Sequence, residues 1–242
     1  MSGAAIAFQG VTCVRGGRQV VGPLSFSVAD GETVVLLGAS GSGKTTTLRL
    51  VNRLLPAAAG TVEVRGRPVD AWHPVRLRRG IGYVIQEIGL FPHFTVAENV
   101  ELVPRLEGWT AAERGRRVDE LLRMVGLEPA TFRHRMPREL SGGQRQRVGV
   151  ARALAADPPI LLCDEPFGAV DPVTRADLQR QFHALTRRLG RAVLFVTHDV
   201  REALALGDRI VLLEDGAVRF AGTPDAFRAS GDDTVRAFQA LL

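Results

Sequence analysis

Short continuous runs of β-branched and aliphatic residues recur along the chain, separated by amphipathic stretches and by glycine, proline or acidic residues. Such runs are typical of strands buried on both faces of a sheet. We expect buried strands at 33–37 (TVVLL), 160–163 (ILLC) and 192–197 (AVLFVT). A strand over 209–213 enters a hairpin with 217–220, because Glu-Asp-Gly lies between them. Shorter antiparallel strands are expected in the N-terminal segment and over 61–64.

Helix starts are marked by capping boxes, in which a Ser, Thr or Asp is followed three residues later by Glu or Gln. The boxes are Thr95-x-x-Glu98, Thr110-x-x-Glu113, Ser141-x-x-Gln144 and Asp199-x-x-Glu202. Another helix is expected from about Lys44 to Leu54, where Pro56 helps to stop it.

Strands that alternate with helices predict a mainly parallel sheet covered by helices, hence an α/β fold. No strand pattern occurs between about Glu87 and Ala156, so the helices there form an insertion. We expect one domain over 1–242, with an α/β core and antiparallel β subdomain in 1–86 and 157–242 and an inserted helical subdomain in 87–156.

Composition limits the class of protein. At 45% hydrophobic residues, the 242-residue chain can bury a substantial core. No apolar run approaches the ~18 residues that span a bilayer, and the N-terminus lacks a signal-peptide pattern. We therefore expect a cytoplasmic chain that needs a partner for any membrane role. Cys13 and Cys163 lie in apolar strand-like segments and are expected to be buried, reduced thiols.

The net charge of +5 comes from 31 basic residues, of which 30 are arginine and one is Lys44. This usage is typical of a GC-rich genome rather than of a basic surface for nucleic acid. Lys44 is therefore informative, because arginine was used everywhere else. Lysine is a compact point charge and arginine a planar fork, so a site that requires lysine is expected to enclose a phosphate tightly.

Lys44 lies in a glycine-rich loop between an expected strand and an expected helix. The segment GASGSGKT matches G-x-x-x-x-G-K-[ST], whose backbone N–H groups cradle phosphates. Lys44 is expected to reach the β- and γ-phosphates of ATP, and the Thr45 hydroxyl to ligate Mg²⁺. The candidate nucleotide-binding residues here are Gly38, Ala39, Ser40, Gly41, Ser42, Gly43, Lys44, Thr45 and Thr46.

Two acidic residues, Asp164 and Glu165, end the buried run ILLC. At this position Asp164 is expected to hold Mg²⁺ through water, and Glu165 to act as general base on the attacking water. The ordinary alternative is an acidic turn before Pro166. The presence of the acidic pair and the phosphate loop in one chain argues against that alternative.

The run Leu140-Ser141-Gly142-Gly143-Gln144 resembles the signature motif of ABC transporter ATP-binding subunits. The resemblance covers practically the whole chain and implies a P-loop NTPase (RecA-like) core. Serine and two glycines at a helix start can form a second anion site, although in isolation they also suit an ordinary capped helix. Ser141 lies 97 positions after Lys44. In the family this motif closes on the ATP of another copy, so the resemblance implies an ATP-dependent head-to-tail dimer.

The resemblance implies three further site residues. Gln86 is similar to the Q-loop glutamine, a ligand of Mg²⁺ and water that senses the γ-phosphate. Asp171 is similar to the D-loop aspartate and suits an N-cap before Pro172 as well. His198 is similar to the H-loop histidine that contacts the γ-phosphate. One position departs from the family pattern: Arg15 stands where an aromatic residue usually stacks on adenine, and a guanidinium can also stack on a purine.

Within the family, the segments 81–109, 148–162 and 202–210 are most similar to importers of quaternary-amine osmoprotectants such as glycine betaine, choline or carnitine. Polar amino-acid importers are the alternative. The resemblance implies permease subunits as partners, a substrate-binding protein reached through them, and a position at the cytoplasmic face of the membrane. Many osmoprotectant ATPases carry C-terminal regulatory modules, which are not expected here because the chain ends at Leu242.

A different class, a soluble P-loop NTPase such as a kinase or GTPase, is disfavoured by the signature motif. The single lysine also excludes the guanine-reading Asn-Lys-x-Asp of GTPases. The DNA-repair relatives need a long coiled coil for which there is no room, and no nucleic-acid partner is expected.

The segment 87–94 (EIGLFPHF) follows Gln86 and contains four large apolar residues around a glycine and a proline. These side chains either fill the core of the helical subdomain or form a surface for a permease helix.

Overall fold

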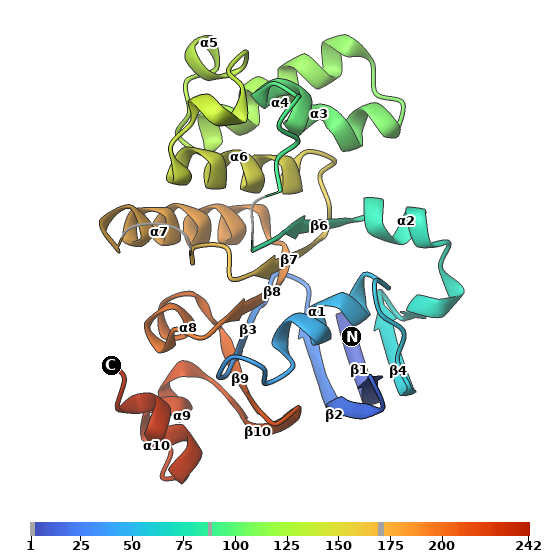
Figure 1. Cartoon of the computed structure of the whole chain (residues 1–242), viewed down its shortest axis with the longest axis vertical. Helices are drawn as coiled ribbons and strands as arrows, with labels where there is room; N and C mark the ends of the chain where they lie inside the picture. The colour runs from blue at the N-terminus through green and yellow to red at the C-terminus, as the bar shows by residue number, and fades with distance from the viewer. Residues whose placement is uncertain (1–2, 87–88, 169–171) are drawn as a thin grey trace. The chain divides into compact units, whose positions relative to one another are not determined.

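The computed structural model describes residues 3–86, 89–168 and 172–242, with the side chains of 172–174 excepted. By its internal contacts the chain divides into two compact units. The first comprises Met1–Arg78 and Gly190–Leu242, and the second comprises Arg79–Leu189. Figure 1 shows the elements by label.

The first unit contains an antiparallel sheet in the strand order β2-β1-β4-β5. Its strands are β1 (Ala4–Arg15), β2 (Arg18–Ala29), β4 (Ala59–Val64) and β5 (Arg67–Pro68). β1 and β2 are joined by Gly16 and Gly17, whose φ angles are 55° and 75°. Two residues with positive φ match the twist of a tight hairpin, which is why glycine suits both positions.

The same unit contains a mainly parallel set of strands in the order β10-β9-β3-β8. These are β3 (Thr33–Leu37), β8 (Ala192–Thr197), β9 (Arg209–Glu214) and β10 (Ala217–Gly222). β3 is parallel to both β8 and β9, and β10 returns antiparallel to β9. Every residue of β3 and β8 is buried, as expected for strands covered on both faces.

The helices α1 (Lys44–Val51), α8 (Val200–Leu206) and α9 (Pro224–Ala229) of the first unit pack on these strands. The unit also contains α10 (Asp233–Gln239) and a 3-10 turn η1 (Val69–Ala71) before α2 (Pro74–Arg79), whose last residue belongs to the second unit. Figure 1 shows α9 and α10, coloured red, beside β10 near the C-terminus.

The second unit combines two parallel strands with a group of helices. β6 (Ile81–Val84) pairs with β7 (Ile160–Asp164), and Val84 lies opposite Cys163. The helices are α3 (Val96–Leu106), α4 (Ala111–Met124), α5 (Pro129–Phe132), α6 (Gly142–Leu154) and α7 (Pro172–Leu189), with a 3-10 turn η2 (Pro137–Glu139). α3 and α4 pack on α6 (Figure 1).

Most elements expected from the sequence are confirmed. The strands are found where the apolar runs predicted them, and the described residues from Gly89 to Ala156 contain helices and turns but no strand. The capping boxes at Thr95, Thr110 and Ser141 are formed. Cys13 and Cys163 are buried free thiols. Among the described residues, no helix is both long and apolar enough to cross a membrane.

Two helix predictions are wrong in detail. The helix expected to reach Leu54 ends at Val51, because Arg53 adopts a φ of 54°. Leu54 is therefore outside the helix and 48% exposed. At α8, Asp199 accepts a hydrogen bond from the Arg201 N–H, and Glu202 contacts Thr197 rather than the Asp199 N–H that a capping box requires.

Candidate functional site

The glycine-rich loop joins the carboxyl end of β3 to the start of α1. A Cβ atom on Gly38 would lie 2.4 Å from the Leu213 carbonyl oxygen and 2.5 Å from Ser42 Oγ. Gly43 has a φ of 96°, and its Cβ would lie 2.8 Å from the Val20 carbonyl oxygen. Both positions therefore require glycine, and the loop curls tightly before the helix begins.

Lys44 is buried at the first position of α1. Its Nζ donates hydrogen bonds to the carbonyl oxygens of Gly38 (2.8 Å) and Ala39 (2.7 Å). The ammonium group thus lies across the loop that its own helix follows. Since a buried charge needs close polar partners, this cation is fixed at the loop rather than free in solvent.

The residues of the loop fit a phosphate chain. Ser42 Oγ is buried and has no hydrogen-bond partner, whereas Ala39, Ser40 and Gly41 are exposed. Thr45 and Thr46 are half-buried in the first turn of α1. A helix start with its free N–H groups, an adjacent ammonium and an unused hydroxyl together form a site for an anion.

His198 follows β8 at the same end of the sheet as the loop. In the parallel pairing of β3 with β8, Leu37 lies opposite Thr197. The next residues along each strand are Gly38 and His198, so the register brings the histidine to the edge where the phosphate loop begins. The His198 side chain is exposed.

The acidic pair lies in the second unit, at the end of β7. Asp164 is buried, and its Oδ2 accepts a hydrogen bond of 3.3 Å from the Tyr83 hydroxyl on β6. Glu165 has a φ of 43°, a left-handed conformation that is uncommon for a residue with a side chain and that is concentrated at functional sites. Gln86 Nε2 donates to Glu165 Oε2 at 3.4 Å. The pairing of β6 with β7 thus brings Gln86 and the acidic pair together.

The signature residues begin α6 in the same unit. Ser141 is exposed, its hydroxyl accepts from the Gln144 N–H (3.2 Å), and Gln144 Oε1 accepts from the Ser141 N–H (2.9 Å). Gly142 and Gly143 form the first turn without side chains. An anion can therefore approach the backbone of this turn closely.

Of the two remaining candidate residues, the structure describes Arg15 but not Asp171. Arg15 is exposed at the end of β1, opposite Arg18 in the β1–β2 hairpin. Asp171 lies outside the described residues. Lys44, Thr45 and His198 belong to the first unit, and Gln86, Ser141, Asp164 and Glu165 to the second.

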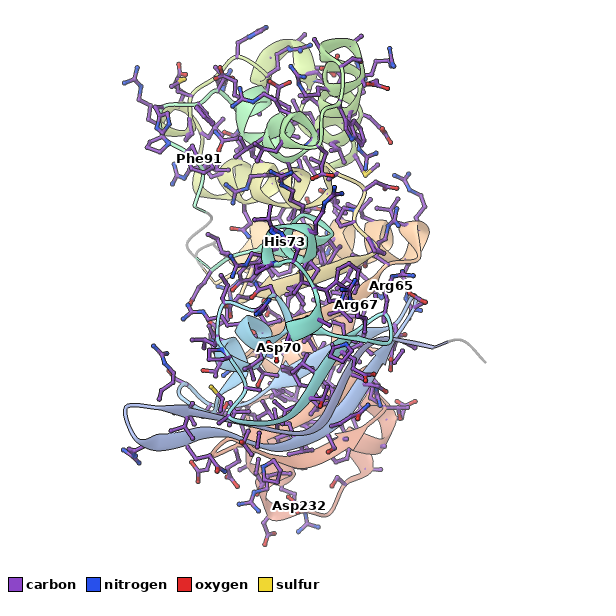
Figure 2. All side chains as sticks on the ribbon, turned by 90° about the vertical axis from the view of Figure 1, so that its right-hand side faces the viewer. Arg65, Arg67, Asp70, His73, Phe91 and Asp232 are labelled. Carbon is purple, nitrogen blue, oxygen red and sulfur yellow. The ribbon has the colours of Figure 1, made fainter. Side chains whose placement is uncertain are left out.

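The segment that follows Gln86 is held by a buried asparagine. Asn99 Oδ1 accepts from the Phe91 N–H (2.8 Å), and Asn99 Nδ2 donates to the carbonyl oxygens of Phe91, Phe94 and Thr95. Phe91 itself is 40% exposed, and Figure 2 shows it at the periphery of the helices. Leu90 and Phe94 are half-buried, and Glu87 and Ile88 lie outside the described residues.

Tyr83 was not expected as a site residue. It is the only tyrosine of the chain, and it stands three positions before Gln86 on a strand that the sequence pattern did not predict. Its contact with Asp164 depends on the pairing of β6 with β7, which the sequence did not predict. The only sequence signal for Tyr83 was therefore that tyrosine occurs once in the chain.

A strand, a glycine loop with a buried lysine, and a helix that starts at that lysine define a P-loop nucleotide-binding fold. The model of the ABC transporter family matches residues 21–168. The chain belongs to this family, and the α/β fold class inferred from the sequence is confirmed.

Several curated proteins are similar over most of the chain. The glycine betaine/carnitine/choline transport ATP-binding protein OpuCA of Bacillus subtilis is 49% identical over 87% of this chain and 55% of its own length. The osmoprotectant import ATP-binding protein OsmV of Salmonella typhimurium is 50% identical over 87% of this chain and 55% of its own. The glycine betaine uptake system ATP-binding protein YehX of Escherichia coli is 47% identical over 96% and 76%. The chain thus spans about half the length of the first two relatives.

Two solved structures of the ATP-binding cassette MJ0796 have the same fold. A dimeric post-hydrolysis state bound to ADP and Pi has a TM-score of 0.80 and 34% identity, and covers 90% of this chain and 98% of that one. A second dimeric structure of this cassette, described as a bacterial ABC transporter cassette, has a TM-score of 0.80 and 35% identity over the same shares.

Proposed function

We propose that this chain binds and hydrolyses Mg-ATP and thereby energises an ABC importer for quaternary-amine osmoprotectants. The observation that carries the proposal is the Gln86–Glu165 pair at the ends of β6 and β7, because it places a carboxylate beside an amide that can orient water. The buried Lys44 in the phosphate loop supports the nucleotide assignment. The family and the described functions of the relatives support the importer.

In the proposed reaction, Lys44 and the loop N–H groups bind the β- and γ-phosphates. Glu165 accepts a proton from the water that attacks the γ-phosphate, Gln86 orients that water, and His198 contacts the γ-phosphate oxygens. The side chains that would hold Mg²⁺ are Thr45, Gln86 and Asp164. When bound, Mg²⁺ neutralises charge on the β- and γ-phosphate oxygens.

This oxygen set fits Mg²⁺ at a nucleotide. Mg²⁺ is usually held by one or two protein oxygens together with phosphates and waters rather than by an all-protein cage.

The proposed catalytic unit is a head-to-tail dimer of two copies. Ser141, Gly142, Gly143 and Gln144 of one copy would close on the ATP held at Lys44 of the other, with Asp171 at the dimer contact. The exposed Ser141 at the start of α6 supports this role, and both MJ0796 structures are described as dimeric. Arg15 is proposed to stack on adenine from the exposed β1–β2 hairpin.

The proposed division of labour within the chain assigns phosphate binding and catalysis to 1–86 and 157–242. The inserted helical subdomain 87–156 would carry the signature residues and the contact with the permease. The exposed Phe91 supports a docking surface at 90–94 for a permease subunit. Through the permease the chain would lie at the cytoplasmic face of the membrane and act with a substrate-binding protein, and no nucleic acid is involved.

Phosphate release by the purified chain tests the ATPase. We expect ATP hydrolysis that requires Mg²⁺ and is abolished by EDTA and by Lys44→Ala. Uptake of radiolabelled glycine betaine, choline and a polar amino acid, in cells with and without the Lys44→Ala allele, tests the cargo. Loss of quaternary-amine uptake alone is expected, whereas loss of amino-acid uptake alone would contradict the proposed substrate class.

A further inference from the structure

A buried threonine and a buried glutamate lie on either side of His198 in the sequence. Thr197, the last residue of β8, is 2% exposed, and Glu202, in α8, is 5% exposed. Thr197 Oγ1 donates a hydrogen bond of 2.5 Å to Glu202 Oε2. The same oxygen accepts a hydrogen bond of 3.0 Å from the Asp199 N–H. One hydroxyl group therefore joins the residue before His198, the residue after it and the helix that follows.

Helix capping does not explain the buried carboxylate. In a capping box the Glu202 carboxylate would accept from the Asp199 N–H. Here that N–H bonds the Thr197 hydroxyl instead, and the start of α8 is capped by the Asp199 carboxylate, which accepts from the Arg201 N–H (2.8 Å). Burying a carboxylate is costly unless it is hydrogen-bonded, and the Thr197 hydroxyl supplies a hydrogen bond to Glu202 at the turn around His198.

The turn at 197–199 lies beside the start of the phosphate loop. Thr197 lies opposite Leu37 in the parallel pairing of β8 with β3, and the phosphate loop starts at the next residue, Gly38. The hydrogen bonds at Thr197 and Asp199 hold the backbone on both sides of His198, and so set the direction in which its side chain leaves the turn.

We infer that Thr197 and Glu202 are positioning residues, which hold His198 in the direction that ATP hydrolysis requires. The inference rests on the proposed function, in which His198 contacts the γ-phosphate. Neither side chain touches the nucleotide in this role. Their effect is on the turnover number, because misplacing a reacting group by about 1 Å can cost on the order of 100-fold in rate.

The test compares two substitutions of one residue. Thr197→Val keeps the shape but removes the hydroxyl, whereas Thr197→Ser keeps the hydroxyl. We expect Thr197→Val to lower kcat by about 10- to 100-fold with less than about a threefold change in the Kd for ATP, since Lys44 is untouched. Thr197→Ser should stay within about threefold of the unsubstituted chain. Glu202→Gln, whose amide oxygen can still accept from Thr197, should also keep most of the activity.

Thr186→Val is the matched control. Thr186 is a buried threonine in α7 whose hydroxyl donates to the Phe182 carbonyl oxygen (3.1 Å). The same substitution there removes a buried hydroxyl that bonds within its own helix, and it should leave kcat unchanged. If Thr197→Val lowers the Tm more than Thr186→Val does, Thr197→Ala is compared with Thr186→Ala instead, since alanine removes the hydroxyl without placing a methyl group there.

A double substitution separates positioning from a general structural role. Since Thr197 acts through His198, Thr197→Val should lower kcat no further in a His198→Ala background. An equal loss of kcat in both backgrounds, or an unchanged kcat in Thr197→Val, would overturn the inference. An unsubstituted chain that hydrolyses no ATP would instead overturn the proposed function, so the two failures are distinguishable.

Discussion

Gln86 and Glu165 are separated by 79 positions in the sequence, yet Gln86 Nε2 lies 3.4 Å from Glu165 Oε2. The contact follows from the parallel pairing of β6 with β7, in which Val84 lies opposite Cys163. The carboxyl ends of the two strands therefore lie side by side. The left-handed backbone of Glu165 turns its side chain at that edge and stores strain that the surrounding structure must offset. This pair supports the proposal that Glu165 is the general base.

The first prediction concerns the requirement for lysine at position 44. Lys44→Ala should weaken ATP binding. Lys44→Arg should also fail, because the buried ammonium is fixed by carbonyl oxygens at 2.8 and 2.7 Å and a planar guanidinium cannot occupy that space. Isothermal titration with ATP and phosphate release measure both effects. Arg49→Lys, in the same helix, is the control and should be silent. Normal hydrolysis by Lys44→Arg would refute the requirement.

The second prediction concerns the shared site. Ser141→Arg should abolish turnover while the isolated subunit still binds ATP, because the signature is proposed to act on the nucleotide of the other copy. Thr110→Arg is a matched control, since Thr110 is the N-cap of an equivalent capping box in α4. Both variants lose a cap, which costs about 1 kcal/mol of stability, but only Ser141→Arg should lose activity.

A mixed dimer refines this prediction. A Lys44→Ala chain paired with a Ser141→Arg chain retains one site with both halves intact, and so should hydrolyse ATP when neither variant does so alone. Full ATPase activity in a preparation shown to be monomeric by light scattering would rule out the shared site.

The third prediction concerns the link to the membrane. Phe91→Asp should leave the ATPase of the isolated subunit intact and abolish uptake by the assembled transporter, because Phe91 is exposed while its backbone is held by Asn99. Leu90→Asp should do the same with some loss of stability, since Leu90 is half-buried. Leu106→Asp, at a position 52% exposed in α3, is the control. A chain unfolded by Phe91→Asp would identify Phe91 as core instead.

The fourth prediction concerns the two thiols. Burial raises the pKa of Cys13, and burial together with the Asp164 charge raises the pKa of Cys163. A raised pKa lowers the thiolate fraction at any pH below it, and the thiolate is the reactive form. We expect no reaction with a disulfide reagent at pH 8 in the native chain and reaction of both cysteines in denaturant. Rapid labelling of either native thiol would contradict the buried placement.

The buried strands could be predicted from the sequence because each is a continuous apolar run, as at 33–37, where all five residues are buried. β6 was missed because it is short and contains Gly82, a poor strand former. The structure explains that glycine, since a Cβ there would lie 2.4 Å from the Ala153 carbonyl oxygen. Such a close approach between segments far apart in the sequence leaves no periodic pattern in the sequence from which the strand could be predicted.

The parts of the site that are local in sequence could also be predicted. The phosphate loop and the box at Ser141 each lie within a few residues, so their geometry follows from the local order of glycine, lysine and serine. The contacts of Gln86 with Glu165 and of Tyr83 with Asp164 depend on strand pairing. The Asp199 box was wrong for another reason, because the Thr197 hydroxyl outcompeted the Glu202 carboxylate for the Asp199 N–H.

Glu165→Gln tests the proposed chemistry most directly. The substitution keeps the shape of the side chain and its capacity to hydrogen-bond, but removes the group that accepts the proton. ATP affinity and phosphate release should be measured on the same preparation, with Mg²⁺ present. We expect a Kd for ATP close to that of the unsubstituted chain and a kcat lower by about 10²- to 10⁴-fold. Hydrolysis at the normal rate with normal ATP binding would show that Glu165 is not the base.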